Sequence, residues 1–156
     1  MTENQVRYLV VGGMAVVFSG YHRLTLDLYI LPDLRKENLE KMVTIMGRLG
    51  YQPRVPVDPK ALLAEEERQR WKEEKGAKVF TYINPKDPFE KVDVLIYNSI
   101  PFDEAFDRKQ VITVNKVPIY VASLEDLIAM KKEAGRAKDL YDIKVLERMK
   151  QEREDE

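Results

Sequence analysis

The spacing of hydrophobic residues changes several times along the chain, and each change marks a predicted element. Residues 6–11 are mostly apolar and stop at Gly12-Gly13, which predicts a buried strand that ends in a tight turn. Residues 14–19 predict a short helix. Over 24–31 the apolar residues occupy the even positions, so the polar residues at odd positions share the opposite face of a second strand.

The remaining spacing predicts an alternation of helices and strands. In its first part it favours a helix lined by Leu39 to Leu49, a proline-containing loop over 51–59, a charged helix over 60–75 and strands over 78–83 and 91–97. These are followed by a hairpin of 111–114 with 117–121, a helix over 123–134 capped by Ser123 and Asp126, and a last helix lined by Leu140 to Met149. These elements predict an α+β fold, a mixed β-sheet with helices packed on it and helices at the C-terminus. We expect one domain over 1–150 and a charged, flexible tail over 151–156.

Composition narrows the class of protein. The 156 residues are 44% hydrophobic and 34% charged, which is typical of one soluble domain. The sequence has no apolar run of membrane-spanning length and no signal-peptide pattern, so we expect a cytoplasmic protein that does not act at a membrane. Without cysteine, disulfides and thiolate catalysis are excluded. The net charge of −1 gives no general attraction to nucleic acid, and the abundance of Glu, Lys and Arg is typical of a thermophile.

Two neighbouring segments near the N-terminus carry candidate chemistry. Glycines at Gly12-Gly13 allow backbone N–H groups to approach a phosphate, although two glycines after a strand are more often a simple turn. On the next strand, Arg23, Thr25, Asp27 and Tyr29 share one face. A half-exposed strand with polar residues in water is the alternative interpretation of that pattern.

A third candidate is Asp93, a carboxylate within the apolar run 91–96. A charge in such a strand needs water, a partner or a metal ion. Two carboxylates on neighbouring strands, here Asp27 and Asp93, are suited to Mg²⁺, which prefers hard oxygen ligands. Two-metal phosphoryl transfer uses such a clamp on the attacking and leaving oxygens.

The segment 127–142 is rich in cations and carboxylates. Its lysines and arginine are residue types that bind a triphosphate. A solvent-exposed helical face with i,i+4 pairs, such as Lys138 with Asp142, is the structural alternative.

Together these segments resemble the polymerase-β-like nucleotidyltransferase superfamily, in particular its minimal and AbiEii-type branch. That branch has an apolar strand, a Gly-Gly or Gly-Ser turn, a short helix, an Arg-x-Thr-x-Asp-x-Asp strand, a third Asp on a later strand and a closing Lys and Arg/Lys-Asp-x-x-Asp segment. The resemblance covers about residues 8–31 and 90–146. The matching positions are Gly12, Gly13, Arg23, Thr25, Asp27, Asp93, Lys131, Arg136, Lys138, Asp139 and Asp142.

The resemblance implies transfer of a nucleoside monophosphate from an NTP to an acceptor hydroxyl, of RNA or protein for example, with Mg²⁺ or Mn²⁺. It implies that Asp27 and Asp93 hold the metal and that Asp27, Asp93 and Asp142 act in catalysis. Asp139 or Asp142 would orient the acceptor or the lysines. It also implies a set of nucleotide-binding residues: Gly12, Gly13, Arg23, Thr25, Lys131, Arg136 and Lys138.

Tyr29 departs from the family pattern, which has a second metal-binding Asp at this position. A phenol is neutral at pH 7 and is a poor magnesium ligand. The enzyme then works with one metal or recruits Asp33 or another carboxylate, or it binds nucleotide without turnover, or it is a non-catalytic scaffold. The last two options describe a degenerate binding module for a nucleotide or partner, as in a toxin–antitoxin pair.

A nucleic-acid-binding function is a weaker alternative, and its candidate residues lie in and after the charged helix: Arg68, Arg70, Trp71, Lys72, Lys75 and Lys78. Five glutamates interleave with these cations, so the field largely cancels and a solvated helix is favoured. His22 adjoins the candidate site, and we interpret it as a positioning or incidental residue because the superfamily uses carboxylates.

Overall fold

The computed structural model describes residues 5–20, 28–97, 100–137 and 139–155. Its centre is one mixed sheet of seven strands in the order β3-β4-β5-β2-β1-β7-β6. The strands are β1 (Tyr8–Val11), β2 (Leu28–Pro32), β3 (Gln52–Pro53), β4 (Val79–Asn84), β5 (Asp87–Leu95), β6 (Gln110–Val114) and β7 (Val117–Val121). The α+β class expected from the hydrophobic pattern is therefore confirmed.

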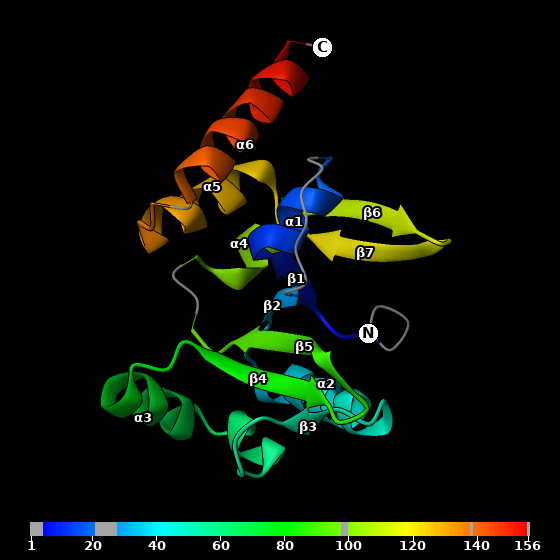
Figure 1. Ribbon diagram of the computed structural model, residues 1–156, viewed down its shortest axis with the longest axis vertical. Helices are drawn as coiled ribbons and strands as arrows, with labels where there is room; N and C mark the ends of the chain where they lie inside the picture. The colour runs from blue at the N-terminus through cyan, green and yellow to red at the C-terminus, as the bar shows by residue number, and fades with distance from the viewer. Residues whose placement is uncertain (1–4, 21–27, 98–99, 138, 156) are drawn as a thin grey trace.

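The helices lie at both ends of the molecule and beside the sheet (Figure 1). They are α1 (Gly12–Phe18), α2 (Lys36–Arg48), the 3₁₀ helix η2 (Pro59–Leu63), α3 (Glu65–Lys75), α4 (Phe102–Asp107), α5 (Leu124–Ala134) and α6 (Asp139–Glu154). Figure 1 shows α2 and α3 at the end of the molecule near β3 and β4, and the α5–α6 pair at the opposite end. Within the described residues, every helix is too short or too polar to cross a bilayer.

Two adjacent rows of residues across the sheet show how its faces differ. Val10, Ile30, Val94 and Phe80 are in register across β1, β2, β5 and β4, and all four are buried. Phe80 stacks on Trp71 of α3 with ring centroids 6.0 Å apart, so this face forms the core beneath the helix. Burial of this apolar row is the main local driving force for the central pairing.

The neighbouring row points to the other face of the same four strands. It contains Val11, Tyr29, Asp93 and Thr81 in register. Three of these four residues are polar, whereas all four residues of the first row are apolar. Tyr29 and Thr81 are half-buried. This face therefore carries the polar chemistry of the central sheet.

The structure differs from the predicted elements in several places. The charged helix expected over 60–75 is two helices, because Ala64 is extended and separates η2 from α3. The expected loop over 51–59 contains the short strand β3, and β5 begins at Asp87. α6 continues through Glu154, so residues 151–154, within the expected tail, are helical.

Other predictions are confirmed at the level of individual contacts. Ser123 caps α5 by accepting a hydrogen bond from the Asp126 backbone N–H, at 3.1 Å. β6 and β7 form the expected hairpin across Asn115-Lys116, where both residues have positive φ. That conformation is the one required by a two-residue hairpin turn.

Candidate functional site

The Gly12-Gly13 turn and Tyr29 form one edge of the candidate site. Val11 pairs with Tyr29 across β1 and β2, which places the tyrosine at the first turn of α1. Gly12 has φ +71°, and a Cβ atom there would lie 3.3 Å from Tyr29 Cδ2. Glycine is therefore required at position 12 by the backbone conformation and by the close approach of the ring.

Asp93 lies directly beside Tyr29 on the neighbouring parallel strand. Adjacent strands are separated by about 4.8 Å, so the two side chains are immediate neighbours on one face. The Asp93 carboxylate is buried, and its Oδ1 accepts a hydrogen bond from the Thr81 hydroxyl. The hydroxyl therefore holds one oxygen of that carboxylate in a fixed position.

The sequence did not indicate Thr81 as part of this site. The signal that identifies it is the register of β4 with β5, in which Thr81 is opposite Asp93. Register between two strands is not visible in either strand alone.

The cationic segment near the C-terminus forms a second cluster, between α5 and α6. Lys131 Nζ lies 3.1 Å from Asp142 Oδ2 and 3.4 Å from Asp139 Oδ1, and all three side chains are buried. Arg136 Nε donates to Asp139 Oδ2 at 2.8 Å. Lys131 and Arg136 therefore contact Asp139, and Lys131 also contacts Asp142, in a cluster that joins the two helices.

The electrostatics of Asp139 follow from these contacts. Burial alone raises the pKa of its carboxyl, but the hydrogen bond from Arg136 and the charges of Lys131 and Arg136 outweigh burial. The pKa of Asp139 is consequently below its ordinary value. A buried carboxylate held in its charged form keeps Lys131 fixed between its two partners.

The structure thus brings together some predicted site residues and separates others. Gly12, Gly13, Tyr29 and Asp93 meet at the β1–α1 junction and the centre of the sheet. Lys131, Arg136, Asp139 and Asp142 meet in the cluster between α5 and α6, and α5 contacts α1. The remaining predicted residues lie outside the described residues, and they are His22, Arg23, Thr25, Asp27 and Lys138.

Asp33 is not a replacement for the missing carboxylate at position 29. It follows β2, roughly 13 Å along the strand from Tyr29 at about 3.3 Å per residue. Its oxygens accept from Arg7 Nη1 at 2.7 Å and from Arg35 Nε at 3.1 Å. Two arginines at the far end of the strand therefore already bind this carboxylate.

The described part of the site contains one carboxylate that could contact a divalent ion, that of Asp93. Across residues 5–20, 28–97, 100–137 and 139–155, no group of three or more His, Cys, Asp or Glu side chains could hold a metal. Asp93 offers a hard oxygen ligand of the type that Mg²⁺ prefers. A magnesium site would need Asp27 in addition to Asp93.

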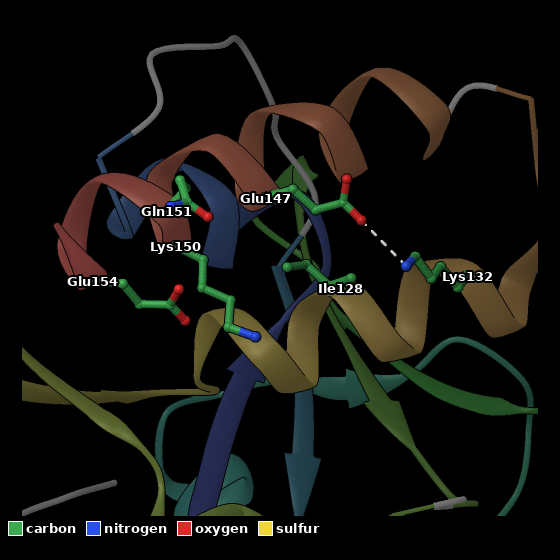
Figure 2. A pocket seen from close by; sticks show the side chains of 6 residues that line it. All are labelled: Ile128, Lys132, Glu147, Lys150, Gln151 and Glu154. Atoms are coloured by element: carbon green, nitrogen blue, oxygen red, sulfur yellow. Dashed lines mark ion pairs between the residues drawn. The ribbon is translucent and has the colours of Figure 1, made fainter.

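A separate pocket of about 260 Å³ lies between α5 and α6 (Figure 2). Its lining is mixed in charge, and Lys132 Nζ pairs with Glu147 Oε1 at 3.1 Å across it. None of the predicted site residues within the described ranges lines this pocket. Its lining residues are Ile128, Lys132, Glu147, Lys150, Gln151 and Glu154.

Two solved structures share the fold of this chain, and one of them is a nucleotidyltransferase. The fold matches the crystal structure of the lincosamide antibiotic adenylyltransferase LnuA with lincomycin bound, at a TM-score of 0.60 and 16% identity, over 95% of this chain and 90% of LnuA. It also matches the solution structure of the antibiotic-resistance factor ANT(2'')-Ia, at a TM-score of 0.59 and 12% identity, over 93% of this chain and 75% of that one. No family model and no curated protein matches the sequence.

These likenesses concern the fold. They confirm the nucleotidyltransferase architecture that the sequence resemblance implied. Assignment to the AbiEii-type branch stays a prediction.

Proposed function

We propose that this protein is a nucleotidyltransferase that transfers a nucleoside monophosphate from an NTP to an acceptor hydroxyl. The observation that carries the proposal is the row formed by Tyr29 and Asp93 beside the Gly12 turn. In this row Tyr29 lies between the glycine turn and a buried carboxylate, on a fold shared with an adenylyltransferase.

The proposed roles follow from residue chemistry. Gly12 and Gly13 carry no side chain, so phosphate oxygens could approach their backbone N–H groups closely. Asp93, together with Asp27, would hold Mg²⁺ or Mn²⁺. When bound, the ion would neutralise negative charge on the reacting phosphates. Thr81 holds the Asp93 carboxylate in one orientation.

The C-terminal cluster is proposed to act in two parts. Lys131 is buried between carboxylates, so it positions α6 relative to α5. The Arg136 side chain is 54% exposed, and with Lys138, Arg23 and Thr25 it would contact the triphosphate. Asp142 would orient these cations through its contact with Lys131.

Because Tyr29 replaces a metal-binding carboxylate, we expect the site to bind one metal ion. The family pattern has three carboxylates, and this chain retains Asp27 and Asp93. With one negative charge fewer, a pair of divalent cations is poorly compensated. We therefore propose catalysis with a single ion and a requirement for high Mg²⁺ concentration.

The test is transfer of label from each α-labelled NTP, with Mg²⁺ or Mn²⁺, to a panel of acceptors. RNA and protein hydroxyls are included, and lincomycin is added because LnuA was solved with it bound. Asp93→Asn should abolish transfer, whereas Glu40→Gln, an exposed carboxylate on α2, should leave it unchanged. Absence of transfer by the parent protein and by Tyr29→Asp would contradict the proposal.

A degenerate binding module, for example one half of a toxin–antitoxin pair, is the second candidate function. The observation in its favour is the Tyr29 ring, which occupies one side of the Gly12 turn in place of an acidic side chain. Calorimetry with ATP and CTP distinguishes the two functions. Nucleotide binding that needs no metal, is unchanged in Asp27→Asn and releases no pyrophosphate would support the module.

A further inference from the structure

The two edges of the seven-stranded sheet are built differently. One edge is β3, which has two residues and ends in Pro53, so it offers little to another strand. The other edge is β6, whose five residues Gln110–Val114 include neither a proline nor a charge. Figure 1 shows the β6–β7 hairpin projecting beyond the rest of the sheet.

The hairpin turn determines which backbone groups of β6 face outward. The two turn residues, Asn115-Lys116, have φ of 50° and 67°, which makes Val114 and the first residue of β7 a hydrogen-bonded pair. Hydrogen-bonded pairs alternate along an antiparallel ladder, so Ile112 is also bonded to β7. The N–H and C=O groups of Val111 and Thr113 therefore point away from β7, to the free edge.

The other side of the same hairpin is protected. By the same alternation, the backbone nitrogen of Pro118 points away from β6. β7 pairs with β1 at Val121, and Pro118 lies on the part of β7 that extends beyond that pair. Proline has no N–H, so this side lacks a donor at that position. Both β3 and β7 thus carry a proline on their free edges, whereas β6 presents two intact donor–acceptor residues.

We propose that β6 pairs with β6 of a second copy of this chain, antiparallel about a twofold axis at Ile112. In this register Val111 of each copy is opposite Thr113 of the other, and all the outward backbone groups of these residues are paired. Val111 is 57% exposed in the single chain and would gain Thr113 of the second copy as a cross-strand neighbour. An interface of this kind is isologous, as expected of a closed dimer.

The charges beside β6 are compatible with this register. Lys116 of the second copy would lie near Arg108, which is already neutralised by Asp126 through contacts of 2.8 and 3.2 Å. Arg153 Nη1 donates to Gln110 Oε1 at 2.9 Å, so the end of α6 lies at the same end of β6. The carboxylates of Glu104, Glu125 and Asp126 lie near Arg108, so the lysine of the incoming hairpin would meet three negative charges there.

Sedimentation analysis of the full chain over a range of concentrations tests the proposal. We expect a monomer–dimer equilibrium with a dissociation constant on the order of 10 µM, since two five-residue strands bury less area than a standard interface. Val111→Lys/Thr113→Lys places like charges opposite one another and should weaken the dimer at least about tenfold. Val111→Lys/Thr113→Glu is the matched control, because each lysine then faces a glutamate, and it should dimerise at least as well as the parent.

Amide hydrogen exchange assigns the association to this edge. The amides of Val111 and Thr113 should become protected as the concentration rises, because they are not bonded within the hairpin. A parent protein that stays monomeric, or a Lys/Glu variant that dissociates as far as the Lys/Lys variant, would overturn the proposal. So would dimerisation that leaves these two amides unprotected.

Discussion

The aromatic ring of Tyr29 lies against the backbone of Gly12, at the point where β1 passes into α1. The contact combines two constraints on position 12, a positive φ and a ring on the side where a Cβ atom would be. The residue that departs from the nucleotidyltransferase pattern is thus part of the packing of the turn as well as of the site.

This contact predicts that Gly12→Ala is destabilising. A non-glycine residue in the left-handed region costs about 1–2 kcal/mol, and displacement of the ring adds to that cost. Urea unfolding should show the loss in the free energy of unfolding. Gly47→Ala is the control, since position 47 is helical with open space around it, and there the substitution should stabilise by up to about 1 kcal/mol.

Lys131→Met should be strongly destabilising. It leaves the buried carboxylates of Asp139 and Asp142 without their shared cation, and removal of one partner from a buried ionic group costs about 3–5 kcal/mol. Lys132→Met provides a matched control one residue away, because the Lys132–Glu147 pair is exposed and should cost less than about 1 kcal/mol. Equal losses in the two variants would contradict a buried cluster.

The cluster also predicts how stability depends on pH. Because the pKa of Asp139 is lowered in the folded state, its contribution is fully present above the ordinary carboxyl range. It is lost as the pH falls through the folded pKa. Arg136→Gln removes the hydrogen bond that lowers this pKa, so its acid unfolding midpoint should move to higher pH, as followed by circular dichroism.

Thr81→Val tests the orientation of Asp93. The variant keeps the side-chain shape but removes the hydroxyl donor, and a hydrogen bond to a charged group contributes about 1.5–3 kcal/mol. Nucleotidyl transfer should fall about tenfold or more, whereas Thr81→Ser should retain most of it. A Thr81→Val protein with unchanged transfer would show that Asp93 needs no such partner.

Tyr29→Asp should increase metal affinity at the cost of stability. A second carboxylate beside Asp93 adds negative charge for Mg²⁺, and loss of the ring removes the contact with Gly12. Magnesium titration by calorimetry should show tighter binding by about tenfold, and thermal unfolding should occur at lower temperature. Tyr29→Asn is the neutral control, and an equal gain in affinity with asparagine would exclude the charge as the cause.

The sequence predicted the elements whose signals are local. The apolar strand before Gly12, the Ser123 cap and the Asn115-Lys116 hairpin are each determined by residues close together in the chain. α4 was not predicted, because its six residues are too few for a helical period to be recognised. The break at Ala64 was missed because the charge pattern runs through it.

The contacts among the candidate site residues were not predictable from the sequence. The position of Tyr29 beside Asp93 depends on parallel pairing of two strands, and the partnership of Lys131 with Asp142 depends on how two helices pack. Neither is specified by spacing along one element. The same lysine is a phosphate ligand by sequence pattern and the centre of an ionic cluster in the structure.

The parallel pairing of β2 with β5 also has a consequence for the order of folding. Tyr29 and Asp93 are joined in register although about 60 residues separate them, and such non-local pairing forms late because the intervening chain must first be ordered. The glycine turn can form early from local contacts, but the carboxylate reaches it only when the sheet is complete. Under the proposed function, a nascent chain would therefore gain its capacity to bind nucleotide in the last stage of folding, and nucleotide would stabilise the finished protein without guiding its formation.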